Sequence, residues 1–319
     1  MNGSESIVEV KNLTITDSAT DRVIASNISF ELKKGEILGF VGESGSGKTL
    51  SMKTVVNLLP SNLVAKSDKF IVLGNDYNEI SENAKKALIG KNIGLVPQNT
   101  VFYLHPMFKI KNQIADGYML YNKKKKLEGI ERAKEKLRIV GFKDPDRILE
   151  SYPWQLSGGM RQRILLSMGI ITSPNLLVVD EPTKAIDWVL RKDIVKELKA
   201  LKDEMKCAML FITHDLGAAS IIADRIAVMY SGEIVETGPA DEVLNNPKHP
   251  YTKGLISAMP SRGLNVMEGY MPSFTDTFDT CRFFPRCTEK THMCDTQIPK
   301  SFSINEHHTV KCNMYCGGN

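Results

Sequence analysis

The chain has 319 residues, of which 42% are hydrophobic and 24% are charged, and its formal net charge is +4. This is an ordinary composition for a globular protein, and the length suits about two domains or one domain with a substantial appendage. The weak positive charge gives no reason to expect nucleic-acid binding, and no stretch approaches the roughly 20 apolar residues that span a bilayer.

Residues 7–41 predict short strands. Apolar and polar residues alternate over 8–15 and 28–32, the pattern of strands with one exposed face. Residues 37–41 instead form a continuous apolar run between Gly35 and Gly42, which predicts a central strand buried on both faces.

The following 200 residues alternate helical and strand patterns. We expect helices over 48–59, 128–140 and 188–202, and strands over 92–97, 176–179 and 208–212. A hairpin over 226–237 should turn at Ser231 and Gly232. Strands that alternate with helices predict an α/β fold with a parallel core.

The composition changes after about residue 240. Prolines recur at 247, 250, 260 and 272, and five of the six cysteines, Cys281, Cys287, Cys294, Cys312 and Cys316, fall in the last 39 residues. In a reducing compartment such a group indicates a metal or cluster site before it indicates disulfides. Cys207 precedes a strand and is expected in the core, while His249, His307 and His308 are expected to be surface or packing residues.

A phosphate-binding loop follows the run at 37–41. Residues 42–49 match G-x-x-x-x-G-K-[ST], with Gly42, Glu43, Ser44, Gly45, Ser46, Gly47, Lys48 and Thr49 in order. The glycines allow backbone N–H groups to turn toward phosphates, and the next helix points its N-terminus at the same anion. Lys48 supplies a positive charge and Thr49 a hydroxyl for Mg²⁺.

Two acidic residues end the strand expected at 176–179. Asp180 and Glu181 then lie at the carboxyl edge of the sheet, where α/β proteins bind ligands. Asp180 is the candidate Mg²⁺ ligand, and Glu181 is the candidate general base for water that attacks the γ-phosphate.

Residues 156–163 (LSGGMRQR) resemble the signature motif of ABC transporter ATPases, and they lie upstream of the acidic pair as in that family. The likeness covers roughly residues 7–240. Gln98 resembles the family's Q-loop glutamine, His214 its switch histidine, and Asp187 the aspartate of its D-loop. The residue usually found at Lys184 is small or carries a hydroxyl, and no aromatic residue for adenine stacking lies between Asn12 and Ser29, so Ile15 or Val23 is expected there.

This resemblance implies a fold and a mechanism. Residues 1–240 would form an ABC cassette, with a RecA-like parallel core, an antiparallel β subdomain and an inserted helical subdomain at about 100–170. Residues 241–319 would add a small irregular, cysteine-rich extension. Two cassettes would close head to tail on ATP, so that Ser157, Gly158 and Gly159 of one contact the γ-phosphate held by the other. His214 would contact the γ-phosphate, and Gln98 both Mg²⁺ and the attacking water.

The extension resembles that of oligopeptide, dipeptide and nickel importers, at residues 249–255 (HPYTKGL) and 258–260 (AMP). Its cysteines resemble the tail of the peptide importers, which is associated with a [4Fe–4S] cluster, and this implies Cys281, Cys287, Cys294 and Cys312 as ligands. By their chemistry alone, four thiolates suit either an iron–sulfur cluster or Zn²⁺, although no close C-x₂-C pair typical of zinc ribbons is present. Cys316 is a spare or alternative fourth ligand.

The family likeness also implies the partners. We expect a second, related ABC ATPase subunit, two transmembrane permease subunits and an extracytoplasmic substrate-binding protein, with this chain at the cytoplasmic face of the membrane. Residues 1–10 lack the pattern of a secretory signal. Two alternatives remain: a nickel or metal-chelate importer, and a soluble ABC ATPase acting on ribosomes or DNA, although the single cassette and the lack of sustained heptads count against the latter.

Overall fold

The computed structural model describes residues 5–98, 103–122, 126–182, 195, 198–200, 202, 204, 206–272 and 279–316. The chain forms two compact units. The helical unit comprises Met1–Ile7, Lys33–Glu36 and Glu79–Phe211, and the loop unit comprises Val8–Leu32, Ile37–Asn78 and Ile212–Asn319. Asp187, Lys184 and most of the helix expected at 188–202 lie outside the described residues.

The loop unit contains an antiparallel sheet in the order β2-β1-β5-β6, with β4 also paired to β1. Its strands are β1 (Ser6–Asp17), β2 (Val23–Lys33), β4 (Leu63–Lys66), β5 (Lys69–Val72) and β6 (Asn75–Asp76). Along β2, the buried residues Ile28, Phe30 and Leu32 alternate with exposed ones. The expected half-exposed strands are therefore confirmed.

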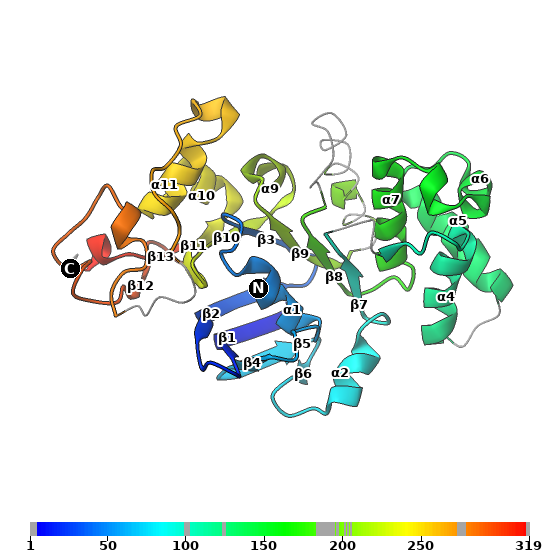
Figure 1. Cartoon of the computed structure of the whole chain (residues 1–319), viewed down its shortest axis with the longest axis horizontal. Helices are drawn as coiled ribbons and strands as arrows, with labels where there is room; N and C mark the ends of the chain where they lie inside the picture. The colour runs from blue at the N-terminus through cyan, green and yellow to red at the C-terminus, as the bar shows by residue number, and fades with distance from the viewer. Residues whose placement is uncertain are drawn as a thin grey trace. The chain divides into compact units, whose positions relative to one another are not determined.

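A second set of strands in the loop unit lies in the order β12-β13-β11-β10-β3 (Figure 1). Its members are β3 (Ile37–Val41), β10 (Arg225–Tyr230), β11 (Glu233–Pro239), β12 (Ser301–Ser303) and β13 (Thr309–Lys311). Every residue of β3 is buried, and β3 runs parallel to β10. The hairpin between β10 and β11 turns at Ser231 (φ 44°) and Gly232 (φ 81°), and these positive φ angles match the tight turn expected from the sequence.

The extension contributes to this sheet. β13 pairs antiparallel with β11, so that Val310 faces Glu236, and β12 pairs with β13. The loop unit's helices are α1 (Lys48–Val55), α9 (Leu216–Ile222), α10 (Ala240–Asn245) and α11 (Pro250–Ser257). His249 caps α11, its Nδ1 accepting the Tyr251 N–H at 3.0 Å, and Pro250 occupies the first turn, where a missing N–H costs nothing.

An aromatic cluster joins the extension to the rest of the loop unit. Tyr230 of β10, Tyr251 of α11 and Phe283 are all buried, with ring centroids 4.6 to 5.5 Å apart. Phe283 lies inside the cysteine-containing segment 281–287, and a short 3₁₀ helix, Phe284–Arg286, follows it directly. The cluster thus anchors that segment against β10 and α11 by burying large apolar rings.

The helical unit contains the strands β7 (Ile93–Val96), β8 (Leu176–Asp180) and β9 (Ala208–Thr213). β7 and β8 are parallel, with Val96 opposite Val179. Its helices are α2 (Glu82–Leu88), α4 (Ile110–Asn122), α5 (Lys126–Ile139), α6 (Pro145–Glu150) and α7 (Gly158–Gly169), with a 3₁₀ turn at Pro153–Gln155. The last four helices pack together, as Figure 1 shows in green, and they confirm the helices expected within 100–170.

None of the described helices is long and apolar enough to cross a membrane.

Candidate nucleotide-binding site

The phosphate loop lies in the loop unit between β3 and α1. Gly42 is there because the backbone approaches β10 closely: a Cβ at Gly42 would lie 2.2 Å from the carbonyl oxygen of Met229. Gly47 caps α1 with φ 100°, a left-handed conformation that glycine adopts without strain. The close packing and the positive φ together explain why the loop needs glycine at both ends.

Side chains inside the loop are buried and hydrogen-bonded. Ser46 is fully buried, and its carbonyl accepts the Gly232 N–H at 2.9 Å. The Lys48 ammonium donates to the carbonyl oxygens of Gly42 and Glu43, both at 2.8 Å, and to Ser46 Oγ at 3.3 Å. Lys48 is thus positioned over the loop, where a phosphate oxygen would replace a carbonyl as its partner.

The first turn of α1 offers an anion-binding end. The N-cap residue makes no side-chain cap hydrogen bond, and the helix begins directly after the loop, a position in which a helix N-terminus can bind an anion. Thr49 is the second residue of the helix, and Ser44 and Gly45 are exposed at the tip of the loop. The expected arrangement of strand, loop and helix is confirmed.

The acidic pair lies in the helical unit. Asp180 is the last residue of β8, and Glu181 follows it with φ 43°, an uncommon angle for a residue with a side chain. Glu181 is only 6% exposed, and its Oε2 accepts a 2.6 Å hydrogen bond from Gln98 Nε2. The structure therefore brings together two residues that are 83 positions apart and that the sequence assigns to the same water.

The signature residues form the start of α7. Ser157 is the N-cap, and its Oγ accepts the Met160 N–H at 3.3 Å. Ser157 and Gly158 are exposed, and a Cβ at Gly158 would meet nothing within 4 Å. The helix N-terminus thus faces open space, where an anion from another molecule can approach it.

His214 follows β9 and is exposed. The next residue, Asp215, caps α9 by accepting the Ala218 N–H at 3.1 Å, and its own N–H donates to Thr213 Oγ1. The cap fixes the backbone beside His214. Of the two residues expected near adenine, Ile15 is fully buried and Val23 is 44% exposed, so only Val23 offers a surface for a base.

The cysteines of the extension lie near one another. The Cys281 N–H donates to the Cys294 carbonyl at 3.2 Å. Burial, together with the neighbouring Cys294, Cys312 and Cys287, raises the pKa of Cys281 to about 11. Burial, with Cys287, Cys294 and Glu289 nearby, raises the pKa of Cys312 to about 11. Within the described ranges, however, no group of three or more His, Cys, Asp or Glu side chains is arranged to hold a metal ion.

Two histidines of the extension and Cys207 pack inside the protein. His249 and His308 are buried, at 2% and 1% exposure, and His308 Nε2 lies 2.8 Å from Glu236 Oε1. Burial lowers the pKa of His249 to about 3. Cys207 is 1% exposed, as expected of a core residue, and burial raises its pKa to about 11.

Sequence reasoning missed three residues of the extension that contact the phosphate loop: Tyr251, Met271 and Arg286. Arg286 forms an ion pair with Glu43, although the two residues are 243 positions apart. No local pattern links residues at such a separation. The one local signal is that Arg286 directly precedes Cys287, and this placement does not point to the phosphate loop.

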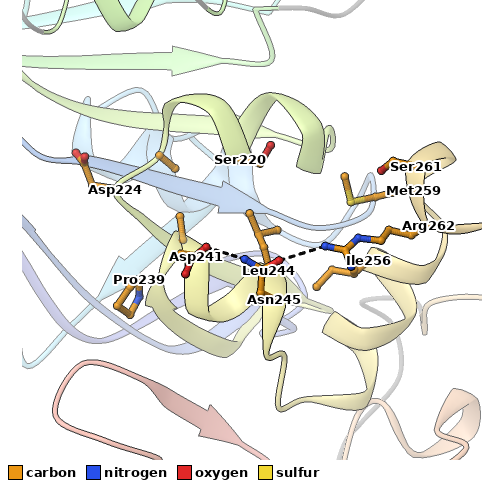
Figure 2. A pocket seen from close by; sticks show the side chains of 12 residues that line it. Ser220, Asp224, Pro239, Asp241, Leu244, Asn245, Ile256, Met259, Ser261 and Arg262 are labelled. Atoms are coloured by element: carbon orange, nitrogen blue, oxygen red, sulfur yellow. Dashed lines mark hydrogen bonds between the residues drawn. The ribbon is translucent and has the colours of Figure 1, made fainter.

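A cavity of about 560 Å³ lies elsewhere in the loop unit, between α9, α10 and the end of α11. Figure 2 shows Asn245 at its centre, where its Nδ2 donates to Asp241 at 2.6 Å and its Oδ1 accepts from Arg262 at 3.2 Å. None of the motif residues lines this cavity. Asp241, Asn245 and Arg262 are thus hydrogen-bonded to one another within the cavity wall.

Comparison with known proteins identifies the family. Residues 25–184 match the family described as ABC transporter. This chain belongs to the ABC transporter family. Residues 235–294 match a second family, the C-terminal region of oligopeptide/dipeptide transporters. As a member of the family with a cassette of its own, the chain is an ATPase.

Relatives match over nearly the whole chain. The oligopeptide transport ATP-binding protein OppD of Bacillus subtilis is 35% identical over 96% of this chain and 88% of its own length. The dipeptide transport ATP-binding protein DppD of the same organism is 33% identical, over 97% of this chain and 94% of its own length.

The fold is also that of solved structures. The structure of cbiO1 from Clostridium perfringens, part of an ABC transporter complex, aligns with a TM-score of 0.65 at 22% identity, over 76% of this chain and 92% of that one. The ABC cassette expected from the sequence is therefore confirmed.

Proposed function

We propose that this ATPase energises the uptake of oligopeptides or dipeptides across the cytoplasmic membrane. The observation that supports this assignment best is the match of residues 235–294 to the C-terminal region of oligopeptide/dipeptide transporters, together with relatives named for those substrates. The extension packs on the same unit that carries the phosphate loop, so the two features belong to one functional module.

Each motif residue receives one role in this proposal. Gly42, Ser44, Gly45, Ser46, Gly47 and Lys48 bind the phosphates, and His214 contacts the γ-phosphate. Glu181 is the general base, and its hydrogen bond to Gln98 holds the carboxylate in one orientation. Ser157, Gly158, Gly159 and Asp187 complete the ATP site of the other subunit.

The residues present suit Mg²⁺. Thr49 offers a hydroxyl, Asp180 a carboxylate and Gln98 an amide oxygen, which are the oxygen donors that this ion prefers. Bound there, Mg²⁺ would offset the negative charge on the phosphates. The chain's own contribution is to hold these donors at the start of α1 and at the end of β8.

The subunit would work within a larger assembly at the cytoplasmic face of the membrane. We propose a heterodimer with a second ABC ATPase, two transmembrane permease subunits and an extracytoplasmic substrate-binding protein. The exposed start of α7 supports dimerisation. Ser157 and Gly158 have open space in front of them, where the ATP bound to a second subunit can approach.

A transport assay tests the substrate. The complete complex is reconstituted in proteoliposomes, and ATP hydrolysis is measured with binding protein that carries peptide, no ligand, or a nickel chelate. We expect peptide-loaded binding protein to stimulate hydrolysis and uptake of labelled peptide to require ATP. Stimulation by the nickel chelate alone would assign the chain to metal uptake instead.

We also propose a [4Fe–4S] cluster on Cys281, Cys287, Cys294 and Cys312. The donor chemistry supports it, because the other three thiols, Cys287, Cys294 and Cys312, lie close enough to Cys281 to raise its pKa. A bound cluster would keep these sulfurs as thiolates and link the segments that carry them. The sulfurs would have to converge further, since the described part of the chain holds no ready-made metal site.

Anaerobic purification tests this cluster. We expect a brown protein with about four iron atoms per chain, and loss of iron in Cys287→Ser but not in Cys207→Ser. A colourless protein that binds zinc would reject the iron–sulfur assignment.

A further inference from the structure

The phosphate loop is held from outside by the extension, through Glu43. Arg286 Nη1 donates to Glu43 Oε2 at 2.7 Å, and Nη2 donates to Oε1 at 3.1 Å. Two parallel bonds between a guanidinium and a carboxylate fix direction as well as distance. Glu43 directly follows Gly42, so this contact acts at the point where the loop leaves β3.

The Arg286 side chain is almost completely buried. Its side chain is 4% exposed, and its guanidinium carbon lies 5.8 Å from the centroid of the Tyr230 ring. Its Nε also donates to the Glu268 carbonyl at 3.1 Å. With so little access to solvent, the pair with Glu43 is screened much less than a surface ion pair.

Two further segments of the extension reach the same loop. The backbone N–H of Glu43 donates to the hydroxyl of Tyr251, which is fully buried, at 2.9 Å. The terminal methyl of Met271 would lie 3.4 Å from a Cβ placed on Gly45. Glu43 is thus held by its carboxylate and its N–H at once, while the Met271 methyl lies close to the exposed tip of the loop.

These contacts differ in kind from those of Lys48. Lys48 bonds to the carbonyl oxygens of Gly42 and Glu43, and in the proposed function a phosphate oxygen competes for the same ammonium. Arg286 and Tyr251 instead contact Glu43, whose side chain is given no phosphate contact in the proposed function. ATP therefore does not compete with Arg286 for the Glu43 carboxylate.

We propose that Arg286 is a positioning residue for the ATPase reaction, and that through its bidentate pair with Glu43 the cysteine-containing segment preorganises the phosphate loop for ATP. This inference rests on the proposed phosphate-binding role of residues 42–49. The role assigned to Arg286 is indirect, because its nitrogens donate to the Glu43 carboxylate and to the Glu268 carbonyl. The energetic consequence is that ATP does not have to order the loop on binding.

The test uses the full chain in its complex and compares Arg286→Gln with Arg262→Gln. Both remove an arginine from the extension, but Arg262 contacts Asn245 rather than the loop. We expect Arg286→Gln to raise the Kd for a non-hydrolysable ATP analogue and the KM for ATP about tenfold, with kcat within about twofold, because one charge-assisted pair is lost. Arg262→Gln should bind like the parent, and Arg286→Lys should recover part of the affinity.

Glu43→Gln breaks the same ion pair by changing its more exposed member, since the Glu43 side chain is 34% exposed. This variant takes the place of Arg286→Gln if Arg286→Gln does not fold. The double variant should bind ATP no more weakly than either single one, since both substitutions break one contact. Additive losses, or an unchanged Kd in Glu43→Gln, would overturn the inference. Lys48→Ala distinguishes this outcome from failure of the loop assignment: if it leaves ATP binding intact, the loop itself is wrongly assigned.

Discussion

In the proposed function two helix N-termini bind phosphate, and the structure builds them in opposite ways. The start of α1 is enclosed: Ser46 and Lys48 are buried, and Arg286 and Tyr251 hold the loop from behind. The start of α7 is open: Ser157 and Gly158 are exposed, and the N-cap bond from the Met160 N–H to Ser157 Oγ lies within the helix's own first turn. Both ends can bind an anion by the same physics.

The difference indicates which helix end can bind ATP without a second subunit. An enclosed, preorganised loop can bind ATP within one chain, because the protein has already ordered the residues that bind. An exposed helix end gains little from a phosphate in water, where solvent competes. It becomes effective only when a second subunit excludes water from it. In the proposed function, ATP capture at α1 is thus separate from subunit closure at α7.

Replacing Glu181 by Gln sharpens this comparison most, because it removes the proposed base while both helix ends stay intact. We expect hydrolysis by the assembled complex to fall about 10³-fold, a typical loss when a general base is removed. ATP affinity should remain near that of the parent. Turnover within a factor of two of the parent would show that another group activates the water.

Gly158→Asp breaks the open end only. The site has room for the side chain, and an acidic residue in the first turn favours the helix itself, so α7 should stay folded. The carboxylate would repel the phosphate of the other subunit, and we expect hydrolysis to fall about 10²-fold, the scale set by losing a helix-end anion site. Binding of ATP to the isolated chain should not change.

Gly158→Ala is the matched control, since it adds a methyl group into the same open space without charge. It should retain most of the activity. If Gly158→Asp and Gly158→Ala were equally active, the start of α7 would play no part in catalysis.

The sequence predicted the phosphate loop and its flanking elements, but not the contacts that hold the loop in place. The fully apolar run at 37–41, the glycines and Lys48 predicted a buried strand, a loop and a helix, because those features are local. The support behind the loop was not predictable. Arg286 and Tyr251 reach Glu43 across more than 200 residues, and nothing in the spacing of either residue specifies that contact.

The extension shows the same limit in its secondary structure. Its prolines suggested irregular chain, yet Pro250 begins α11, because proline fits the first turn of a helix. Likewise, β13 pairs with β11 through only a few residues, too few to give a strand pattern. Short strands and helices that depend on contacts with neighbouring elements have little sequence pattern of their own, so they are hard to predict.

Acid should lower the free energy of unfolding of the protein through His249, which caps α11. Its pKa is about 3 in the folded protein against 6.5 for a free histidine, so the neutral ring stabilises the fold fully above pH 6.5, and this contribution is lost as the pH falls toward 3. We expect the parent to lose about 2 kcal/mol of unfolding free energy from this residue between pH 7 and pH 5.

His249→Asn tests this contribution, since asparagine can still cap α11 but does not titrate. Thermal unfolding between pH 7 and pH 5 should show a smaller loss of stability in this variant than in the parent. The exposed His307 provides the control, and His307→Asn should follow the parent. Equal acid sensitivity in all three proteins would place the titrating group elsewhere.

Nucleotide-dependent association tests the central claim most directly. The two ATPase subunits, both with the base replaced as in Glu181→Gln, are mixed and their molar mass is followed by light scattering with and without ATP and Mg²⁺. The account predicts that mass doubles only with ATP, and that adding Gly158→Asp to this chain prevents the increase while ATP still binds. Subunits that stay separate with ATP bound, or that pair equally well with Gly158→Asp, would contradict it.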